Sequence, residues 1–247
     1  MPYHDTVMSP SRFNYDSVAS GHYEKIIWDA HPVRQFWHQV RFVDMENLID
    51  SNENSVLLDH GCASGSFLGH FRRPYAQAVG VDIAKPQVEL ANKKYGTPKL
   101  HFLTTDEFSK GKDASFDYVI STEVIEHIPA AEAEELMRQF HRWLKPGGRL
   151  ILSTPNYCSL WPLIELFVNR FSGVDYDHQH VYKLDSKKCA QLLEKCGFKV
   201  EKYMTTFILA PFLAGISWKW AERLYRLEQK LIPRGGSLIL LSASKRG

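Results

Sequence analysis

The chain has 247 residues, which is enough for one large α/β domain or two small ones. Hydrophobic residues make up 44% and charged residues 23%, as in a globular protein, and the formal net charge of +2 argues against a nucleic-acid partner. The 4 cysteines have no C-x-x-C spacing, so they indicate neither a zinc site nor a disulfide framework, and they favour a reducing compartment, the cytoplasm.

Signals for secretion and for membrane insertion are both weak. The first residues lack a basic region followed by an apolar core, so we expect no secretory signal. The longest uncharged stretch, residues 203–218, contains Pro211 and several polar residues. It falls short of the roughly 20 apolar residues that a membrane-spanning helix needs. We therefore expect no transmembrane segment.

The first 50 residues mix polar and aromatic side chains, and apolar positions recur between residues 26 and 50. We expect residues 11–50 to be mostly helical and treat residues 1–50 as an N-terminal helical cap. Strands and helices then alternate over residues 51–156, which we expect to be the nucleotide-binding core. Residues 157–247 would add an aromatic lid insertion, an amphipathic helix and closing antiparallel strands to the same single domain.

A glycine turn after the first predicted strand is the strongest local signal. Residues 55–59 predict a buried strand that ends in Asp59, and Gly61 and Gly65 follow it. Gly61 can adopt backbone angles closed to other residues, and Gly65 lets a ligand or helix come close. A strand, a glycine turn and a helix together form the nucleotide-binding corner of a doubly wound α/β sheet.

A second apolar strand, near residues 77–82, ends in Asp82. An acid at about this distance from the glycine turn binds ribose hydroxyls in nucleotide-binding folds. Its two acceptor oxygens suit a cis-diol, which presents two donors. The alternative is that Asp82 only caps the turn that follows it.

Further strands are predicted near residues 99–103, 116–121 and 148–153, and helices near residues 64–71, 86–95, 131–144 and 186–196. This alternation predicts a parallel sheet with right-handed crossovers. The helix over 131–144 opens with acidic and closes with basic residues, an order that favours the helix dipole. Pro146-Gly147-Gly148 then ends it and turns the chain into the next strand.

The chain changes character after residue 156. Apolar residues recur at helical spacing over 160–171, and a second amphipathic helix is predicted over 212–231, before a closing strand at 237–242. We expect the apolar stripe of each helix to be buried on neighbouring elements as core, over an apolar acceptor as a lid, or on a membrane surface. The stripe of the second helix comprises Leu213, Ile216, Trp220, Leu224, Leu227 and Leu231.

Several motifs together resemble one enzyme family. The run 59–65, DHGCASG, resembles the first motif of class I S-adenosylmethionine (SAM) methyltransferases, D-x-G-C-G-x-G, with Ala63 in place of the middle glycine. Residues 116–128, 144–150 and 192–200 resemble the later motifs of that family in the right order and spacing. The E-x-x-E-H run at 123–127 and the strand end STPN at 153–156 are most similar to the ubiquinone-biosynthesis O-methyltransferase-like branch.

The resemblance implies a Rossmann-like, doubly wound seven-stranded α/β sheet with its last strand antiparallel. It also implies SAM bound across the carboxyl ends of the first strands and released as S-adenosylhomocysteine. Asp59 and the 61–65 turn would face the methionine part, Asp82 the ribose hydroxyls and Ile83 the adenine. Asp106 would accept a hydrogen bond from the adenine amino group, with Glu107 as the alternative acceptor. The cofactor-binding residues that the resemblance implies are Asp59, Gly61, Cys62, Ala63, Gly65, Asp82, Ile83, Asp106, Glu107, Ser121, Thr122 and Glu123.

A sulfonium is already a good leaving group, so methyl transfer asks the protein chiefly to align an acceptor in line. A base is needed only if the acceptor starts protonated, as a hydroxyl does, and histidine titrates near neutrality. His127, His178 and His180 are the candidates, with His127 and His180 preferred as catalytic residues. The alternative is that His127 bonds backbone and the other two brace a loop.

The E-x-x-E-H run has a second interpretation. Carboxylates and an imidazole together, here Glu123, Glu126 and His127, are typical of divalent metal sites, and His178 or His180 would supply the fourth ligand. Small-RNA 3′-terminal 2′-O-methyltransferases and some quinone O-methyltransferases use a similar run in this way. Many relatives without metal carry the run too, so we do not expect a divalent metal.

The sequence therefore predicts a SAM-dependent methyltransferase that acts on a small or lipid-like acceptor at oxygen, with at most weak peripheral membrane contact. A metal-assisted RNA 2′-O-methyltransferase is the alternative within enzymes, disfavoured by the near-neutral charge. A catalytically silent protein that binds SAM for regulation or assembly is the alternative from another class, since its cofactor motifs would look the same.

Overall fold

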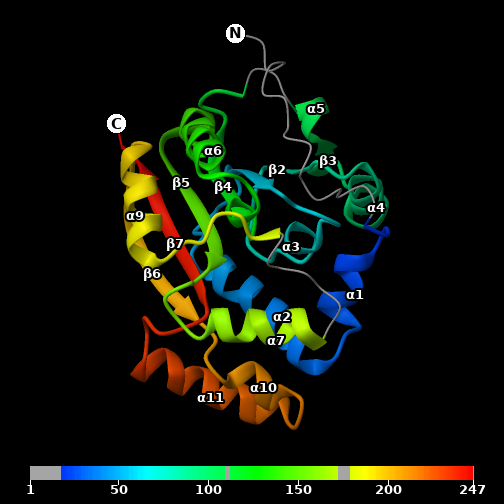
Figure 1. The fold of residues 1–247 in the computed structure, drawn as a ribbon. Helices are drawn as coiled ribbons and strands as arrows, with labels where there is room; N and C mark the ends of the chain where they lie inside the picture. The colour runs from blue at the N-terminus through cyan, green and yellow to red at the C-terminus, as the bar shows by residue number, and fades with distance from the viewer. Residues whose placement is uncertain (1–17, 109–111, 172–178, 247) are drawn as a thin grey trace.

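The computed structural model describes residues 18–108, 112–171 and 179–246, apart from the side chains at 167, 168 and 171. A seven-stranded sheet lies at its centre, in the order β3-β2-β1-β4-β5-β7-β6 (Figure 1). Strands β1 to β5 pair in parallel, and β7 is antiparallel to both of its neighbours. This confirms the predicted doubly wound sheet with its last strand antiparallel. The strands are β1 (Val56–His60), β2 (Gln77–Asp82), β3 (Leu100–Thr104), β4 (Phe116–Thr122), β5 (Leu144–Pro155), β6 (Phe198–Thr206) and β7 (Leu238–Lys245).

The strand order reverses next to β1. From β1 the chain crosses to β2 and β3 on one side, and then returns to place β4 and β5 on the other side. Open α/β sheets bind ligands at such a switch point, in the crevice outside the carboxyl ends of the strands. The glycine turn after β1 lies at this point of the sheet.

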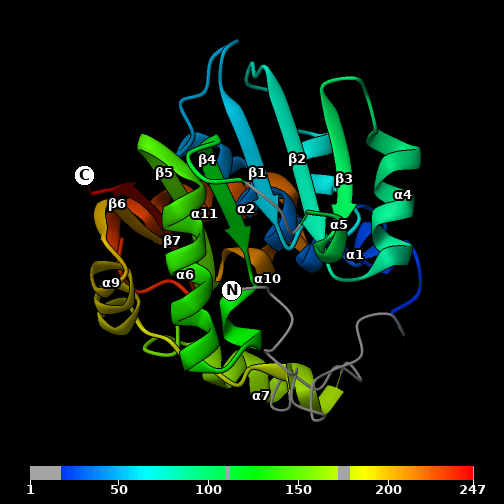
Figure 2. The ribbon, with the colours of Figure 1, turned by 90° about the horizontal axis from the view of Figure 1, so that it is seen from above.

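Helices cover both faces of the sheet because consecutive strand residues point to opposite faces. Leu57 belongs to a core completed by α2, α4, α10 and α11, whereas Leu58 belongs to a second core completed by α6 and α9. Figure 2 shows α6 and α9 on one side of the sheet and α2 with α11 on the other. The helices are α1 (His22–Trp28), α2 (Pro32–Asn47), α3 (Ser66–Gly69), α4 (Lys85–Tyr95), α5 (Thr105–Phe108), the 3-10 turn η2 (Ile125–His127), α6 (Ala130–Trp143), α7 (Trp161–Phe171), α9 (Ser186–Lys195), α10 (Ala210–Ala214) and α11 (Trp218–Leu231).

The prediction of a single helix over 212–231 is wrong. The chain forms α10 and α11 as separate helices, because the Ser217 hydroxyl accepts the Trp220 N–H at 3.4 Å and starts a new helix there. The helix predicted over 64–71 is also too long. It shrinks to α3, since Gly65 has a φ of +76° and the helix begins only after it. Likewise, the mostly helical N-terminal segment is interrupted between α1 and α2.

The buried face of α11 also differs from the prediction. The residues of this helix that are fully or almost fully buried are Ala221 and Glu228, and Tyr225 bonds to Asp44 of α2. Ile216, Trp220 and Leu231 of the predicted stripe are 85%, 57% and 65% exposed. Leu213 and Leu224 do pack against the core, so the predicted stripe marks the core only in part. Within the described residues, no helix is both long enough and apolar enough to cross a membrane.

Candidate functional site

The turn after β1 is held by backbone bonds and by close packing. Gly61 has a φ of +83°, and its N–H donates to the Val81 carbonyl at 2.7 Å. A Cβ at Gly61 would lie 2.3 Å from Val124 Cγ2, and one at Gly65 would lie 2.7 Å from the Phe102 ring. Ala63 takes a left-handed φ of +45° although it replaces the motif's middle glycine. Neither Gly61 nor Gly65 can therefore be replaced by a residue with a side chain unless its neighbours move.

Asp82 ends β2 beside this turn. Its Oδ2 accepts the N–H of Ala63 at 2.8 Å, and its Oδ1 accepts the N–H of Ala84 at 2.9 Å. Asp82 therefore caps its own turn and ties the glycine turn to β2. A carboxylate oxygen can accept more than one hydrogen bond, which suits the two donors of a ribose diol. Ile83, which follows, is 46% exposed and offers an apolar surface.

Asp59 is almost fully buried at the carboxyl end of β1, with 2% of its surface exposed. Burial, with the nearby Asp82 charge as the second cause, raises the pKa of Asp59 from 3.8 to about 7, against the opposing effect of Arg41. Burial likewise raises the pKa of the Cys62 thiol well above its usual range. The end of β1 therefore favours a cationic neighbour, which would stabilise the ionised Asp59.

The two acids predicted at the adenine differ in their surroundings. Glu107 Oε2 accepts the Thr104 N–H at 2.7 Å and the Thr104 hydroxyl at 2.9 Å, so it caps its own turn. Asp106 is exposed on the same short helix, α5. On β4, the hydroxyls of Ser121 and Thr122 are buried and have no hydrogen-bond partner among the described residues.

Glu123 follows β4 with a φ of +55°, and its N–H donates to the Ser153 carbonyl at 3.2 Å. Its Oε1 accepts the Ser153 hydroxyl at 2.8 Å, and its Oε2 lies 3.9 Å from Arg41 Nη1. Burial raises the pKa of Glu123, while the Arg41 charge opposes the rise. The left-handed backbone turns this carboxylate inward, toward α2.

Glu126, His127 and His180 form a buried cluster. Each offers one ligand atom, and these atoms all lie within 4.8 Å of one another. Thr154 donates to Glu126 Oε2 at 3.1 Å, whereas Glu126 Oε1 is buried without a hydrogen-bond partner in the described part of the chain. Burial, then the charge of Glu123, raises the pKa of Glu126 well above its usual range.

Hydrogen bonds orient both imidazoles in this cluster. His127 Nδ1 lies 3.1 Å from the Gln179 carbonyl, which can only accept, so Nδ1 carries the hydrogen and Nε2 the lone pair. His180 Nδ1 lies 3.0 Å from Glu165 Oε1, and the Tyr157 hydroxyl donates to the same oxygen at 2.8 Å. Burial opposes ionisation of Glu165, but hydrogen bonds from these two partners hold its pKa below its usual value. Burial, then the neighbouring His180, lowers the pKa of His127 to about 4.

The structure thus brings together Glu126, His127 and His180, two of which were the preferred catalytic candidates. Glu123 of the predicted metal set is held by Ser153 instead, and His178 lies outside the described residues. Sequence reasoning missed Arg41, which is 7% exposed on α2, and the Tyr157–Glu165 pair. No motif marks these residues, although Glu165 is the one acid of α7.

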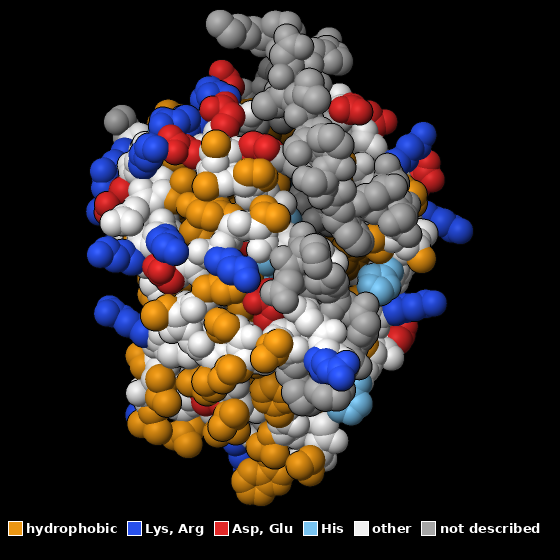
Figure 3. Space-filling model, viewed as in Figure 1, with side chains coloured by type: hydrophobic (Ala, Val, Ile, Leu, Met, Phe, Trp, Pro, Cys, Tyr) orange, Lys and Arg blue, Asp and Glu red, His pale blue; other side chains and the backbone are white. Residues whose placement is uncertain are grey.

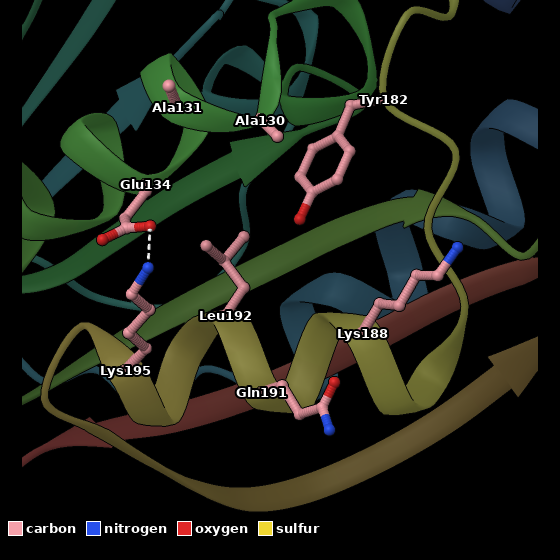
Figure 4. A pocket seen from close by; sticks show the side chains of 8 residues that line it. All are labelled: Ala130, Ala131, Glu134, Tyr182, Lys188, Gln191, Leu192 and Lys195. Carbon is pink, nitrogen blue, oxygen red and sulfur yellow. Dashed lines mark hydrogen bonds and ion pairs between the residues drawn. The ribbon is translucent and has the colours of Figure 1, made fainter.

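A separate groove lies between α6 and α9 (Figure 4). It carries the Glu134–Lys195 ion pair, in which Nζ and Oε2 are 2.6 Å apart. Its lining contains no residue of the glycine turn or of the Glu126–His127–His180 cluster, so we do not assign it to the site. The lining residues are Ala130, Ala131, Glu134, Tyr182, Lys188, Gln191, Leu192 and Lys195.

Comparison with known proteins identifies the family. The family model described as "Methyltransferase domain" matches residues 36–203, more than half of the chain. The chain belongs to this methyltransferase family. The match covers the glycine turn, Asp82 and the Glu126–His127–His180 cluster, and SAM is the cofactor of the family's class I fold.

Two curated proteins are similar to this chain over part of its length. It is 30% identical over 155 residues to phosphoethanolamine N-methyltransferase of Plasmodium falciparum, covering 61% of this chain and 56% of that protein. It is 27% identical over 176 residues to the mitochondrial ubiquinone biosynthesis O-methyltransferase of Mus musculus, covering 67% of this chain and 46% of that protein. The chain thus spans about half the length of these curated relatives.

Solved structures share the fold. A chain from the complex between the Haloferax volcanii Trm112 methyltransferase activator and a methyltransferase has a TM-score of 0.66 at 20% identity, with 96% of this chain and 99% of that chain covered. Haemonchus contortus phosphoethanolamine N-methyltransferase 2, in complex with SAM, has a TM-score of 0.59 at 18% identity, with 85% of this chain and 53% of that chain covered. At these identities the likeness concerns the fold alone.

Proposed function

We propose that this chain transfers the methyl group of SAM to an oxygen atom of a small or lipid-like acceptor. The observation that carries the proposal is the Glu126–His127–His180 cluster beside the carboxyl ends of β4 and β5, next to the glycine turn that follows β1. The mouse relative is named as a ubiquinone biosynthesis O-methyltransferase, in agreement with oxygen as the acceptor atom. The Plasmodium relative is named for phosphoethanolamine and nitrogen, so the acceptor atom is the point to test.

The cofactor would supply a methyl group on a sulfonium, and the protein would position the acceptor and take up its proton. Asp82, Ile83 and the 61–65 turn are proposed to bind SAM. His127 is uncharged at neutral pH because its pKa is lowered to about 4, so its Nε2 carries a lone pair that can accept a hydrogen bond from an acceptor hydroxyl. Glu165 orients the second imidazole of the cluster through His180 Nδ1. A neutral amine acceptor would need no such base before methyl transfer.

A metal-assisted form is the second candidate, and one observation favours it. The donors of the cluster match those of divalent metal sites. His127 and His180 each have a backbone or carboxylate partner at Nδ1, and Glu126 Oε1 is buried without a hydrogen-bond partner among the described residues. Glu126, His127 and His180 would hold the ion. It would lower the pKa of a bound hydroxyl and so promote loss of its proton.

The test is uptake of label from methyl-labelled SAM by lipid, aqueous and RNA fractions of a cell extract. We expect uptake in the lipid or small-molecule fraction, with a methyl ether identified by mass spectrometry. We expect His180→Ala to abolish uptake while SAM binding persists, and the exposed His101→Ala to be the unaffected control. Uptake by RNA would favour the 2′-O-methyltransferase alternative. SAM binding without uptake in any fraction would favour a catalytically silent SAM-binding protein.

A further inference from the structure

An exposed apolar face lies on α10, on α11 and at the start of α7. Figure 3 shows hydrophobic side chains gathered over the part of the surface where these helices lie. Ile216, Trp220 and Leu231 are 85%, 57% and 65% exposed, although a helix normally buries such side chains. We name this surface the α7/α10/α11 face. Its exposed apolar residues are Leu160, Leu163, Leu166, Leu209, Phe212, Ile216, Trp220, Leu227, Leu231 and Ile232.

Most exposed charges on the same helices are positive. Between residues 209 and 234 the exposed charged side chains are lysine or arginine except for Glu222, which pairs with Arg226 at 3.6 Å, and α7 adds the exposed Arg170. The guanidinium of Arg223 lies 4.9 Å from the centre of the Trp220 ring, so basic and apolar groups share one surface. The exposed basic residues of α11 and the turn after it are Lys219, Arg223, Arg226, Lys230 and Arg234.

Two of the three acids of these helices are buried and bonded inside. Glu228 accepts the N–H groups of Leu209 and Ala210 at 2.7 and 3.0 Å and is 7% exposed. Glu165 is bonded to Tyr157 beside His180 and is 3% exposed. The third acid, Glu222, accepts the indole N–H of Trp218 at 3.0 Å and pairs with Arg226 at 3.6 Å, so it offsets one of the basic residues. The face thus presents apolar groups together with an excess of cationic groups.

We infer that the α7/α10/α11 face binds the surface of a bilayer that contains anionic phospholipids. Large apolar side chains, a tryptophan and flanking Lys and Arg are the composition of helices that lie in a membrane interface. Anionic headgroups attract each basic residue near the surface, and a neutral protein partner would offer no such complement. The inference goes beyond the proposed methyl transfer, because vesicle binding needs neither SAM nor an acceptor.

Co-sedimentation of the intact chain with vesicles tests this inference. The protein should bind vesicles of phosphatidylcholine with about a third phosphatidylserine, bind pure phosphatidylcholine much more weakly, and dissociate at high salt. Ile216→Ser with Leu231→Ser should abolish binding without lowering the melting temperature, because both side chains are exposed. The tryptophan fluorescence of the unsubstituted chain should shift to shorter wavelength when vesicles are added, and Trp220→Phe should reduce this shift, since five other tryptophans contribute to the signal.

Charge-matched variants provide the control. Lys219→Gln with Lys230→Gln should weaken vesicle binding roughly 25-fold, at about fivefold for each basic residue removed. Lys93→Gln with Lys99→Gln removes the same charge from α4 and the segment after it, away from the face, and should leave binding unchanged. Equal loss in both pairs would overturn the inference, as would no binding to anionic vesicles at low salt. Self-association abolished by the Ile216 and Leu231 substitutions, without vesicle binding, would assign the face to a second copy instead.

Discussion

Replacing Asp59 by Asn tests whether burial keeps a proton on this carboxyl group in the SAM-free protein. The pKa of Asp59 rises from 3.8 to about 7 on folding, and its side chain is almost fully buried. Between these two values the folded chain holds a proton that the unfolded chain releases. Raising the pH therefore favours unfolding, by about 1.4 kcal/mol per pH unit, and the loss reaches up to about 4 kcal/mol above pH 7.

The Asn variant cannot ionise at this position, so this loss should disappear. We expect its free energy of unfolding to match that of the unsubstituted chain near pH 4 and to exceed it by up to about 4 kcal/mol at pH 8. Urea unfolding at pH 5, 6, 7 and 8 measures the difference, with the exposed Asp113→Asn as the matched control. A difference that does not change with pH, or a variant that is less stable at pH 8, would refute this account.

The same variant should bind SAM more weakly at pH 8, by roughly tenfold or more. SAM carries a cationic sulfonium and amino group, and we assign Asp59 to its methionine part. Binding should ionise Asp59, so the affinity of the unsubstituted chain should rise between pH 6 and pH 8. Calorimetry at both pH values measures this. An affinity of the Asn variant equal to that of the parent at pH 8 would remove Asp59 from the cofactor site.

The remaining predictions concern the cofactor and the metal. SAM at a hundredfold excess over its Kd should stabilise the chain by about 2.7 kcal/mol and raise its Tm, whereas a larger shift with NAD would contradict the assigned cofactor. Asp82→Ala should lower SAM affinity at least tenfold, and unchanged affinity by calorimetry would place the ribose elsewhere. The same substitution should lower the free energy of unfolding by about 1–3 kcal/mol, because the N–H groups of Ala63 and Ala84 lose their acceptor. Methyl transfer should survive chelator if the site works without metal, whereas loss of activity that Mg²⁺ or Mn²⁺ restores would favour the second candidate, with an ion held by Glu126, His127 and His180. Full activity after chelation would leave His127 and His180 as bases only.

Much of the fold could be predicted because the sheet depends on local signals. Local sequence alone indicates the apolar runs at β1 and β2, each followed by an acid, and the turn made by the proline and two glycines at 146–148. The predicted bounds of β1 to β4 lie within one residue of the observed ones. The buried faces of helices were harder to predict, because periodicity indicates an apolar stripe but not which element covers it. On α11 the chain buries Ala221 and Glu228 and exposes Trp220 and Leu231, an outcome set by α2 and α10.

The candidate site was predictable where one segment carries it. Residues 123–127 contribute Glu126 and His127 of the cluster, and the sequence indicates them together. Nothing local shows that His180, after α7, would join Glu126 and His127, or that Glu165 and Tyr157 would hold its imidazole. Those contacts depend on how α7 packs beside the end of β5, which is a tertiary property.

The charges around the crevice explain why one arrangement can suit both a cationic cofactor and a divalent ion. Asp59, Glu123 and Glu126 are buried or half-buried near the carboxyl ends of β1 and β4, and Arg41 is the cation that opposes their raised pKa values. One guanidinium does not balance three carboxylates, and burial without counter-charge is costly. The SAM-free site can relieve the imbalance by holding protons, as the raised pKa values of the acids indicate. A bound cation relieves it by Coulomb attraction instead. Protons and cationic ligands should therefore compete at this end of the sheet, so the affinity for SAM, and for a divalent ion if one binds, should rise with pH.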